Sequence, residues 1–262
     1  MKKLNWSSLL IFLCTLFFLG GFINPVLAEE KSESISDADL TLYQGGINPA
    51  EILVDNGQEL FSAVKGKAGK SCASCHDGQN PSGGSLEGVA ANFPKFTKTA
   101  GQVTSLQKQV NACETKHMQS ELTPLKSKEM VSMVLYVKSL SEGAPVNVKV
   151  DGEAQKMFEL GKLVFEQRRG QRNMSCQVCH DMLPGRTLRM QKLAKIGVAA
   201  SHWPAYRMKK GETYLIEQRF QQCMKNARMK PLKEGTDPMI ALELYITNRA
   251  KGAPVEIPGW VR

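Results

Sequence analysis

The sequence lacks a second long apolar stretch after its N-terminal run at residues 9–22. A helix that crosses a membrane needs about 20 predominantly apolar residues, so no membrane span is expected in the rest of the chain. The sequence also lacks a basic run interleaved with aromatic residues, because lysine and arginine are spread along the chain. The formal net charge of +9 therefore does not indicate nucleic-acid binding and instead suits an anionic substrate or an acidic protein partner.

The N-terminal run has the order of residues that is typical of a secretory signal. Lys2 and Lys3 precede the apolar core, and the small residue Ala28 stands at the expected cut. We expect residues 1–28 to be removed on export, which leaves 262 − 28 = 234 residues, with a retained anchor as the alternative. No lipobox precedes a cysteine at the cut, so a lipoprotein is not expected. The polar residues 29–50 predict an extended or mobile N-terminal arm.

Six cysteines remain after the signal, and an exported chain with six cysteines first suggests three disulfides. Four of them, however, fall in two C-x-x-C-H motifs, Cys72-Ala-Ser-Cys75-His76 and Cys176-Gln-Val-Cys179-His180. This spacing lets two thiols add to the vinyl groups of a haem while the histidine reaches the iron from one face. A C-x-x-C pair alone is also compatible with a zinc or redox site. The fifth residue, the export signal and the second copy favour two covalently bound haem c groups, with both histidines as axial iron ligands.

The haem motifs belong to a longer internal repeat. Gly57 precedes the first motif as Gly161 precedes the second, at an offset of 161 − 57 = 104 residues that the motifs share. Residues 88–91, 105–113, Tyr136 and residues 143–146 recur in the same order at 197–200, 215–223, Tyr245 and 252–255. Five matched blocks in one order predict a tandem duplication. We therefore expect an all-α fold of two class I cytochrome c-like haem domains, at residues 51–147 and 148–262.

The same repeat indicates the second axial ligand of each iron. Cys113 and Cys223 are the two remaining cysteines, and they align with each other, which predicts two irons ligated by histidine and cysteine. A disulfide between these two cysteines is the alternative, although it would need an unusual contact between the domains. The other candidate ligands stay open, namely His117, His202, Met224 and Met229.

The two copies differ in charge around these cysteines. Arg219 lies four residues before Cys223, so both share one helix face, and Arg228 and Arg249 follow in the second copy. The first copy has no arginine near Cys113. Arginine binds oxyanions through paired hydrogen bonds, so we predict that Arg219, with Arg228 and Arg249 as further candidates, binds an anionic substrate. A solvated basic helix face is the alternative.

The chain resembles the SoxA family, the A subunits of the SoxAX cytochromes of sulfur oxidation, in their two-haem form. The segments that carry the resemblance are residues 172–181, 219–224 and 241–245. The resemblance implies a periplasmic L-cysteine S-thiosulfotransferase, which couples thiosulfate oxidatively to a cysteine of the carrier protein SoxYZ. It further implies a small monohaem partner, SoxX, and a small cytochrome c as electron acceptor. By this resemblance Cys223 is the catalytic group and Arg219 is the cation beside it.

Three other functions remain open from the sequence. A thiosulfate dehydrogenase that forms tetrathionate would also use haem ligated by histidine and cysteine. A dihaem cytochrome that only transfers electrons would need no chemistry at Cys223. A dihaem peroxidase is less favoured, because nothing in the sequence indicates an open haem site with an acid–base residue.

Overall fold

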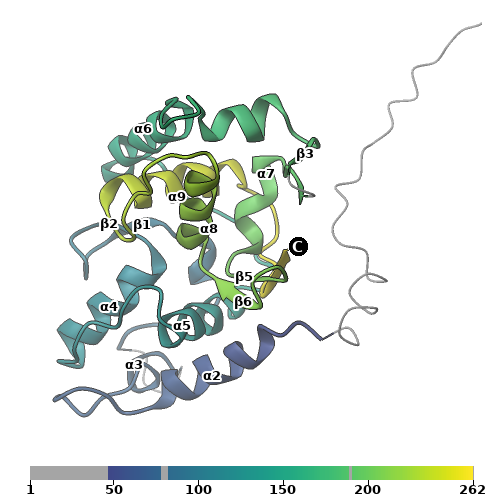
Figure 1. Ribbon diagram of the computed structural model, residues 1–262. Helices are drawn as coiled ribbons and strands as arrows, with labels where there is room; N and C mark the ends of the chain where they lie inside the picture. The colour runs from purple at the N-terminus through teal and green to yellow at the C-terminus, as the bar shows by residue number, and fades with distance from the viewer. Residues whose placement is uncertain (1–46, 78–81, 189–190, 262) are drawn as a thin grey trace, which may run out of the picture. The chain divides into compact units, whose positions relative to one another are not determined.

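The structure is a computed structural model that describes residues 47–77, 82–188 and 191–261 (Figure 1). The predicted signal at 1–28 and most of the predicted arm, residues 29–46, lie outside the described residues. The last residues of that arm pack onto the fold. Asn48 donates a hydrogen bond of 2.8 Å from Nδ2 to the carbonyl oxygen of Pro258, and Ala50 is fully buried.

The first half of the described chain, residues 51–139, begins and ends with a 12-residue helix. Its elements in order are α2 (Glu51–Ser62), the short helix α3 (Ala73–His76), the 3₁₀ helix η1 (Val89–Asn92), the hairpin of β1 (Lys95–Thr97) and β2 (Gln102–Thr104), α4 (Leu106–His117) and α5 (Lys128–Ser139). Helix α2 packs against α5. A Cβ on Gly57 would overlap the carbonyl oxygen of Ser132, so the close approach of these two helices requires glycine there.

The second half, residues 153–261, repeats this order with additions. It contains α6 (Glu153–Glu166), the π-helical turn η2 (Val178–Met182), the hairpin of β3 (Thr187–Leu188) and β4 (Gln191–Lys192), α7 (Ile196–Ala199), η3 (Ala200–His202), β5 (Ala205–Arg207), β6 (Glu212–Tyr214), α8 (Ile216–Asn226), α9 (Asp237–Arg249) and β7 (Gly259–Val261). Helix α6 packs against α9, and Gly161 meets the carbonyl oxygen of Ala241 as Gly57 meets that of Ser132.

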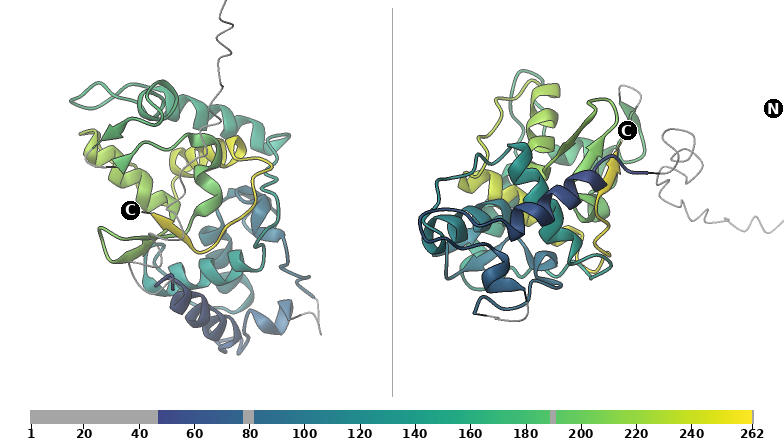
Figure 2. Two further views of the ribbon diagram at one scale, coloured as in Figure 1. Left: turned by 90° about the vertical axis from the view of Figure 1, so that its right-hand side faces the viewer. Right: turned by 90° about the horizontal axis from the view of Figure 1, so that it is seen from below.

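The described residues are mainly helical, but they also include short strands that the all-α prediction did not foresee. Each strand is two or three residues long, which is too short to produce a visible alternation of apolar and polar residues. Strand β5 is the middle strand of a small sheet, antiparallel to β6 and parallel to β7, the last strand of the chain (Figure 2). Arg207 is the last residue of β5 and pairs with Glu212 of β6.

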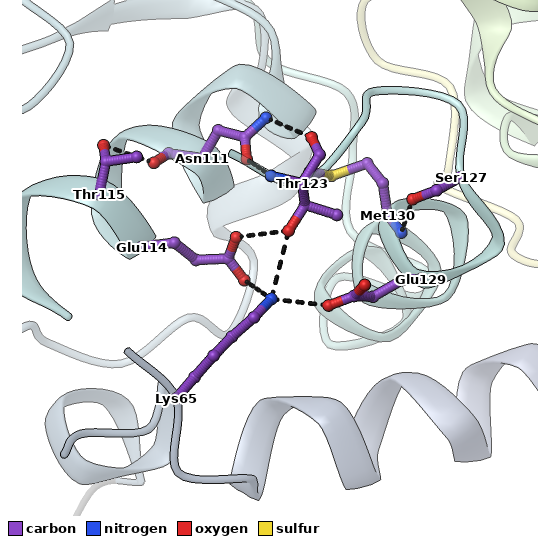
Figure 3. A network of polar contacts seen from close by, with 8 residues as sticks. All are labelled: Lys65, Asn111, Glu114, Thr115, Thr123, Ser127, Glu129 and Met130. Atoms are coloured by element: carbon purple, nitrogen blue, oxygen red, sulfur yellow. Dashed lines mark hydrogen bonds and ion pairs between the residues drawn. The ribbon is translucent and has the colours of Figure 1, made fainter. Parts of the chain in front are cut away.

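A network of polar contacts fastens the loop after α2 to helices α4 and α5 (Figure 3). The ammonium group of Lys65 lies 3.0 Å from a carboxylate oxygen of Glu114 and 2.6 Å from one of Glu129. Thr123 donates a hydrogen bond of 2.9 Å from its hydroxyl to Glu114, and the side chain of Asn111 pairs with the Thr123 backbone in both directions. Glu114 is only 2 % exposed, so this network replaces the water that would otherwise stabilise its carboxylate.

The two halves share a core. One cluster of buried apolar side chains includes Met130 and Leu135 from α5 together with Ile240 and Leu244 from α9. The repeated segments 143–146 and 252–255 also pair with each other through backbone hydrogen bonds, around an antiparallel bridge between Pro145 and Pro254. The division into domains at 51–147 and 148–262 stays a prediction. None of the helices among the described residues is both long and apolar enough to span a membrane.

Candidate functional site

The first C-x-x-C-H motif lies in and just before the short helix α3. Ser71 holds the start of this turn, because its hydroxyl accepts a hydrogen bond from the backbone N–H of Ser74 at 3.1 Å and its carbonyl accepts one from the Ser74 hydroxyl at 2.7 Å. The ring of His76 donates from Nδ1 to the carbonyl oxygen of Gly84 at 2.8 Å. This bond places the proton on Nδ1 and leaves Nε2 as the nitrogen available to a metal.

The second motif has the same arrangement on the π-helical turn η2. Ser175, which is buried, accepts a long hydrogen bond of 3.4 Å from the backbone N–H of Val178. The ring of His180 donates from Nδ1 to the carbonyl oxygen of Ala194 at 2.9 Å, so its Nε2 is likewise available. The loop that contributes this carbonyl leads into α7.

The structure brings each of the two remaining cysteines to a different motif. Cys113 on α4 interacts electrostatically with Cys72 and Cys75. Cys223 on α8 interacts with Cys176 and Cys179 and also with the ring of His180. All six of these cysteines are free thiols, so the alternative of a disulfide between Cys113 and Cys223 is wrong.

This donor set fits a c-type haem. In the second motif, two attachment thiols lie beside a histidine whose Nε2 is available, and the sulfur of Cys223 faces that histidine. Burial alone would lower the pKa of His180, but its contacts with Cys223 and with the Ala194 carbonyl raise it overall. A bare structural zinc ion would need about four converging ligands, and within the described ranges no three His, Cys, Asp or Glu side chains converge closely enough to hold a metal ion.

The surroundings of Cys113 and Cys223 shift the pKa values of the two thiols in opposite directions. Burial raises the pKa of the Cys113 thiol, against a hydrogen bond of 3.3 Å that Gln109 donates to its sulfur. Burial also disfavours the thiolate of Cys223, but Arg219 and His180 more than compensate, so the pKa of Cys223 is lowered. Cys223 therefore favours the thiolate form, which is both the nucleophile and the metal-ligating form of cysteine.

The predicted arginines occupy different positions around this sulfur. Arg219 acts on Cys223 from one turn earlier in α8, as its spacing predicts. Arg249 lies at the end of α9 beside the second motif, but its guanidinium is paired with Asp181 through two hydrogen bonds of 2.8 Å. Arg228 follows α8 with an exposed side chain and a φ of +53°, and its carbonyl accepts a hydrogen bond from the backbone of Gln171.

The other candidate iron ligands have surroundings of their own. His117 is exposed at the end of α4, and His202 pairs through Nδ1 with Glu256 at 2.8 Å. Met224 and Met229 are buried in the apolar core of the second half. Among the candidates, Cys223 contacts the ring of His180, and Cys113 interacts with the cysteines of the first motif.

Sequence reasoning missed one residue of this site, Arg207. It interacts electrostatically with both Cys223 and Arg219, although it lies on β5 and not on α8. A signal existed: at the offset of 110 residues that aligns Cys113 with Cys223, Arg207 stands where the first half has Thr97 (207 − 110 = 97).

Comparison with known proteins gives one consistent family. The model of the SoxA/TsdA cytochrome c domain matches residues 56–146 and again residues 160–255. The L-cysteine S-thiosulfotransferase subunit SoxA of Hydrogenobacter thermophilus is 33 % identical over 93 % of this chain and 95 % of its own length. The subunit of the same name from Paracoccus pantotrophus is 35 % identical over 80 % of this chain and 70 % of its own.

A solved structure agrees with these relatives. The crystal structure of SoxXA from P. pantotrophus superposes with a TM-score of 0.75 at 35 % identity, covering 82 % of this chain and 79 % of that one. A cytochrome c domain implies covalently bound haem c. The chain therefore belongs to the SoxA/TsdA cytochrome c family and, within it, to the SoxA proteins.

Proposed function

We propose that the chain is the catalytic subunit of a periplasmic L-cysteine S-thiosulfotransferase, with Cys223 as its catalytic group. The observation that carries the proposal is the asymmetry between the two cysteines: Arg219 and His180 favour the thiolate at Cys223, whereas Cys113 has a neutral glutamine beside it. The enzyme name borne by the SoxA relatives supports the same activity.

The proposal includes two covalently bound haem c groups, one in each half. Cys72 and Cys75 would hold the first, and His76 and Cys113 would bind its iron. In the second half the corresponding residues are Cys176, Cys179, His180 and Cys223. We further propose that the halves are class I cytochrome c-like domains that arose by internal duplication; the two matched regions and the repeated order of elements support this origin.

The reaction joins the outer sulfur of thiosulfate to a carrier cysteine. In the first step the Cys223 thiolate and thiosulfate form a sulfur–sulfur bond, giving Cys223–S–S–SO₃⁻ and releasing two electrons. When bound, haem supplies one-electron acceptors for these electrons, which then pass to a small cytochrome c. In the second step the carrier thiol loses its proton and attacks the middle sulfur of the adduct, the one bonded to the Cys223 sulfur. The bond between that sulfur and Cys223 breaks, so the carrier leaves as the S-thiosulfonate and Cys223 returns as thiolate.

The side chains around the sulfur have separate tasks in this scheme. Arg219 binds the negative oxygens of thiosulfate and favours the Cys223 thiolate, since a nearby guanidinium stabilises both anions. His180 donates its Nδ1 proton to the Ala194 carbonyl in a hydrogen bond, which would leave Nε2 free to bind the haem iron.

Two protein partners belong to the proposal. A small monohaem cytochrome subunit, SoxX, completes the complex, as in the SoxXA complex of P. pantotrophus that this chain resembles. The second partner is the sulfur-carrier protein SoxYZ, whose thiol receives the product. The predicted secretory signal supports a periplasmic location.

The test compares two matched variants of the haem-loaded complex. Cys223→Ala should abolish thiosulfate-dependent modification of the carrier cysteine, measured by intact mass. Cys113→Ala, the same change at the equivalent place in the first half, should retain it. Unchanged modification by the Cys223→Ala variant would rule out this assignment, and rapid tetrathionate formation without a carrier would instead identify a thiosulfate dehydrogenase.

A further inference from the structure

The side chain of Arg207 is buried without a full set of partners. The residue is only 3 % exposed, and its Nε and Nη1 atoms have no hydrogen-bond partner among the described residues. A buried donor that is left unpaired is costly, and more so when it belongs to a charged group. This position therefore favours the binding of an anion by Arg207.

Two cations act on the sulfur of Cys223 from different elements. Arg219 acts from the same helix, and Arg207 acts from the end of β5, in the hairpin that precedes α8. Burial and repulsion from Arg219 lower the pKa of Arg207 to about 10, against the attraction of the Cys223 thiolate. An anion bound near Arg207 would offset both its burial and its repulsion from Arg219.

The first half has neutral residues at both equivalent places. Thr97 stands at the position of Arg207 and donates a hydrogen bond of 2.6 Å from its hydroxyl to Gln109. Gln109 stands at the position of Arg219 and donates in turn to the sulfur of Cys113 at 3.3 Å. Thr97 and Gln109 are therefore neutral and hydrogen-bonded to each other, so the first half offers no comparable site for an anion.

We propose that Arg207 is a second substrate-binding residue, which binds the oxygens of thiosulfate together with Arg219 beside Cys223. The inference rests on the proposed function, because that function supplies the anion. Guanidinium groups suit this task, since their planar donors match an oxyanion in pairs. A haem carboxylate is the other anion within chemical reason, but the first half has the same attachment motif with Thr97 at this place.

The test uses the haem-loaded complex and thiosulfate itself. Arg207→Thr installs the first-half residue, Arg207→Lys retains the charge, and Lys210→Gln removes an exposed charge from the turn of the same hairpin. Thiosulfate binding is measured by titrating the visible spectrum of the haem without carrier protein, and KM and kcat are measured with it. Arg207→Thr should weaken thiosulfate binding and raise KM by at least about tenfold, with a smaller change in kcat. The KM of Arg207→Lys should lie between those of Arg207→Thr and the wild type. The KM of Lys210→Gln should stay within about twofold of the wild-type value.

The outcomes separate this inference from the proposed function. Unchanged thiosulfate affinity in Arg207→Thr, together with a shifted haem potential or reduced haem content, would assign Arg207 to a haem carboxylate and overturn the inference. Loss of affinity in Arg207→Thr supports the inference even if the wild type makes no S-thiosulfonate, a result that would overturn the function alone. If Arg207→Thr does not incorporate haem, the thiosulfate affinity of Arg207→Lys is compared with that of the wild type instead.

Discussion

Arg249 holds Asp181 through two parallel hydrogen bonds of 2.8 Å, from Nη1 to Oδ2 and from Nη2 to Oδ1. Asp181 directly follows His180, so this pair ties the end of α9 to the second C-x-x-C-H motif. The guanidinium also lies over the ring of Phe165, 5.3 Å from its centroid. These contacts favour a positioning task for Arg249 over the substrate binding that its sequence position suggests.

We predict that Arg249→Lys and Asp181→Asn have the same kinetic effect. Either change removes the paired geometry, which lysine does not reproduce, so kcat should fall roughly tenfold because the haem motif is less well positioned. The thiosulfate KM should stay within about twofold of the wild type, and the double variant should be no worse than either single variant. Steady-state kinetics of the carrier reaction provide the measurement. A lower KM in Asp181→Asn would contradict this view, because it would mean that a freed Arg249 binds thiosulfate.

The close crossing of α6 and α9 gives a second prediction. A Cβ on Gly161 would overlap the carbonyl oxygen of Ala241, so Gly161→Ala must push the two helices apart. We expect a loss of about 2–4 kcal/mol in the free energy of unfolding, although alanine is the better helix former. Denaturant titration measures this loss, with exposed Lys162→Ala in the same helix as the control. Equal stability of the two variants would show that the helices can separate at little cost.

The network around Lys65 gives a third prediction. Lys65→Met leaves Glu114 buried without its cation and should destabilise the protein by ~1–3 kcal/mol at neutral pH. Thr123 then remains as the hydrogen-bond donor to Glu114. Replacing Glu114 by glutamine in the same variant should recover part of the loss, because the buried charge is removed. The exposed Lys67→Met is the matched control, and a loss of similar size there would show that the network adds nothing specific.

Much of the candidate site could be predicted from the sequence because its signals are local. The C-x-x-C-H spacing and the four-residue step from Arg219 to Cys223 each fit within about one helical turn. The repeat then related Cys113 to Cys223 across 110 residues without any knowledge of the fold. In the structure these two cysteines lie beside separate motifs, as that alignment requires.

The remaining features depend on contacts between distant segments. Asp181 and Arg249 are 68 residues apart, and neither carries a signal for the other. Arg207 ends a three-residue strand, so no periodicity indicated that it would be buried or close to α8. The shared core also depends on such contacts. The sequence places Leu135 and Leu244 on the apolar faces of two helices but does not say what those faces pack against, and only the packing of the two halves shows that both residues belong to one cluster.

Two buried carboxyl groups, one on α8 and one on α9, give the last prediction. Glu217 is 1 % and Glu243 is 8 % exposed. Burial and the negative charge of Glu243 raise the pKa of Glu217 to about 8, although the backbone N–H of Gly235 donates to it at 2.8 Å. Burial raises the pKa of Glu243 to about 7, against the attraction of Lys138.

Both carboxyl groups ionise near 4.5 in the unfolded chain, so from about pH 4.5 to 8 the folded protein binds more protons than the unfolded one. The free energy of unfolding should therefore fall as the pH rises through this window. Glu217→Gln removes one of the two groups and should flatten the pH profile, so that the variant matches the wild type at pH 5 and exceeds it at pH 8.5 by on the order of 1–3 kcal/mol. Denaturant titrations at both pH values measure this difference, with the exposed Glu121→Gln as control. An unchanged pH slope in Glu217→Gln would mean that this carboxyl group is already ionised in the folded protein at low pH, since only a proton held by Glu217 can produce its share of the slope.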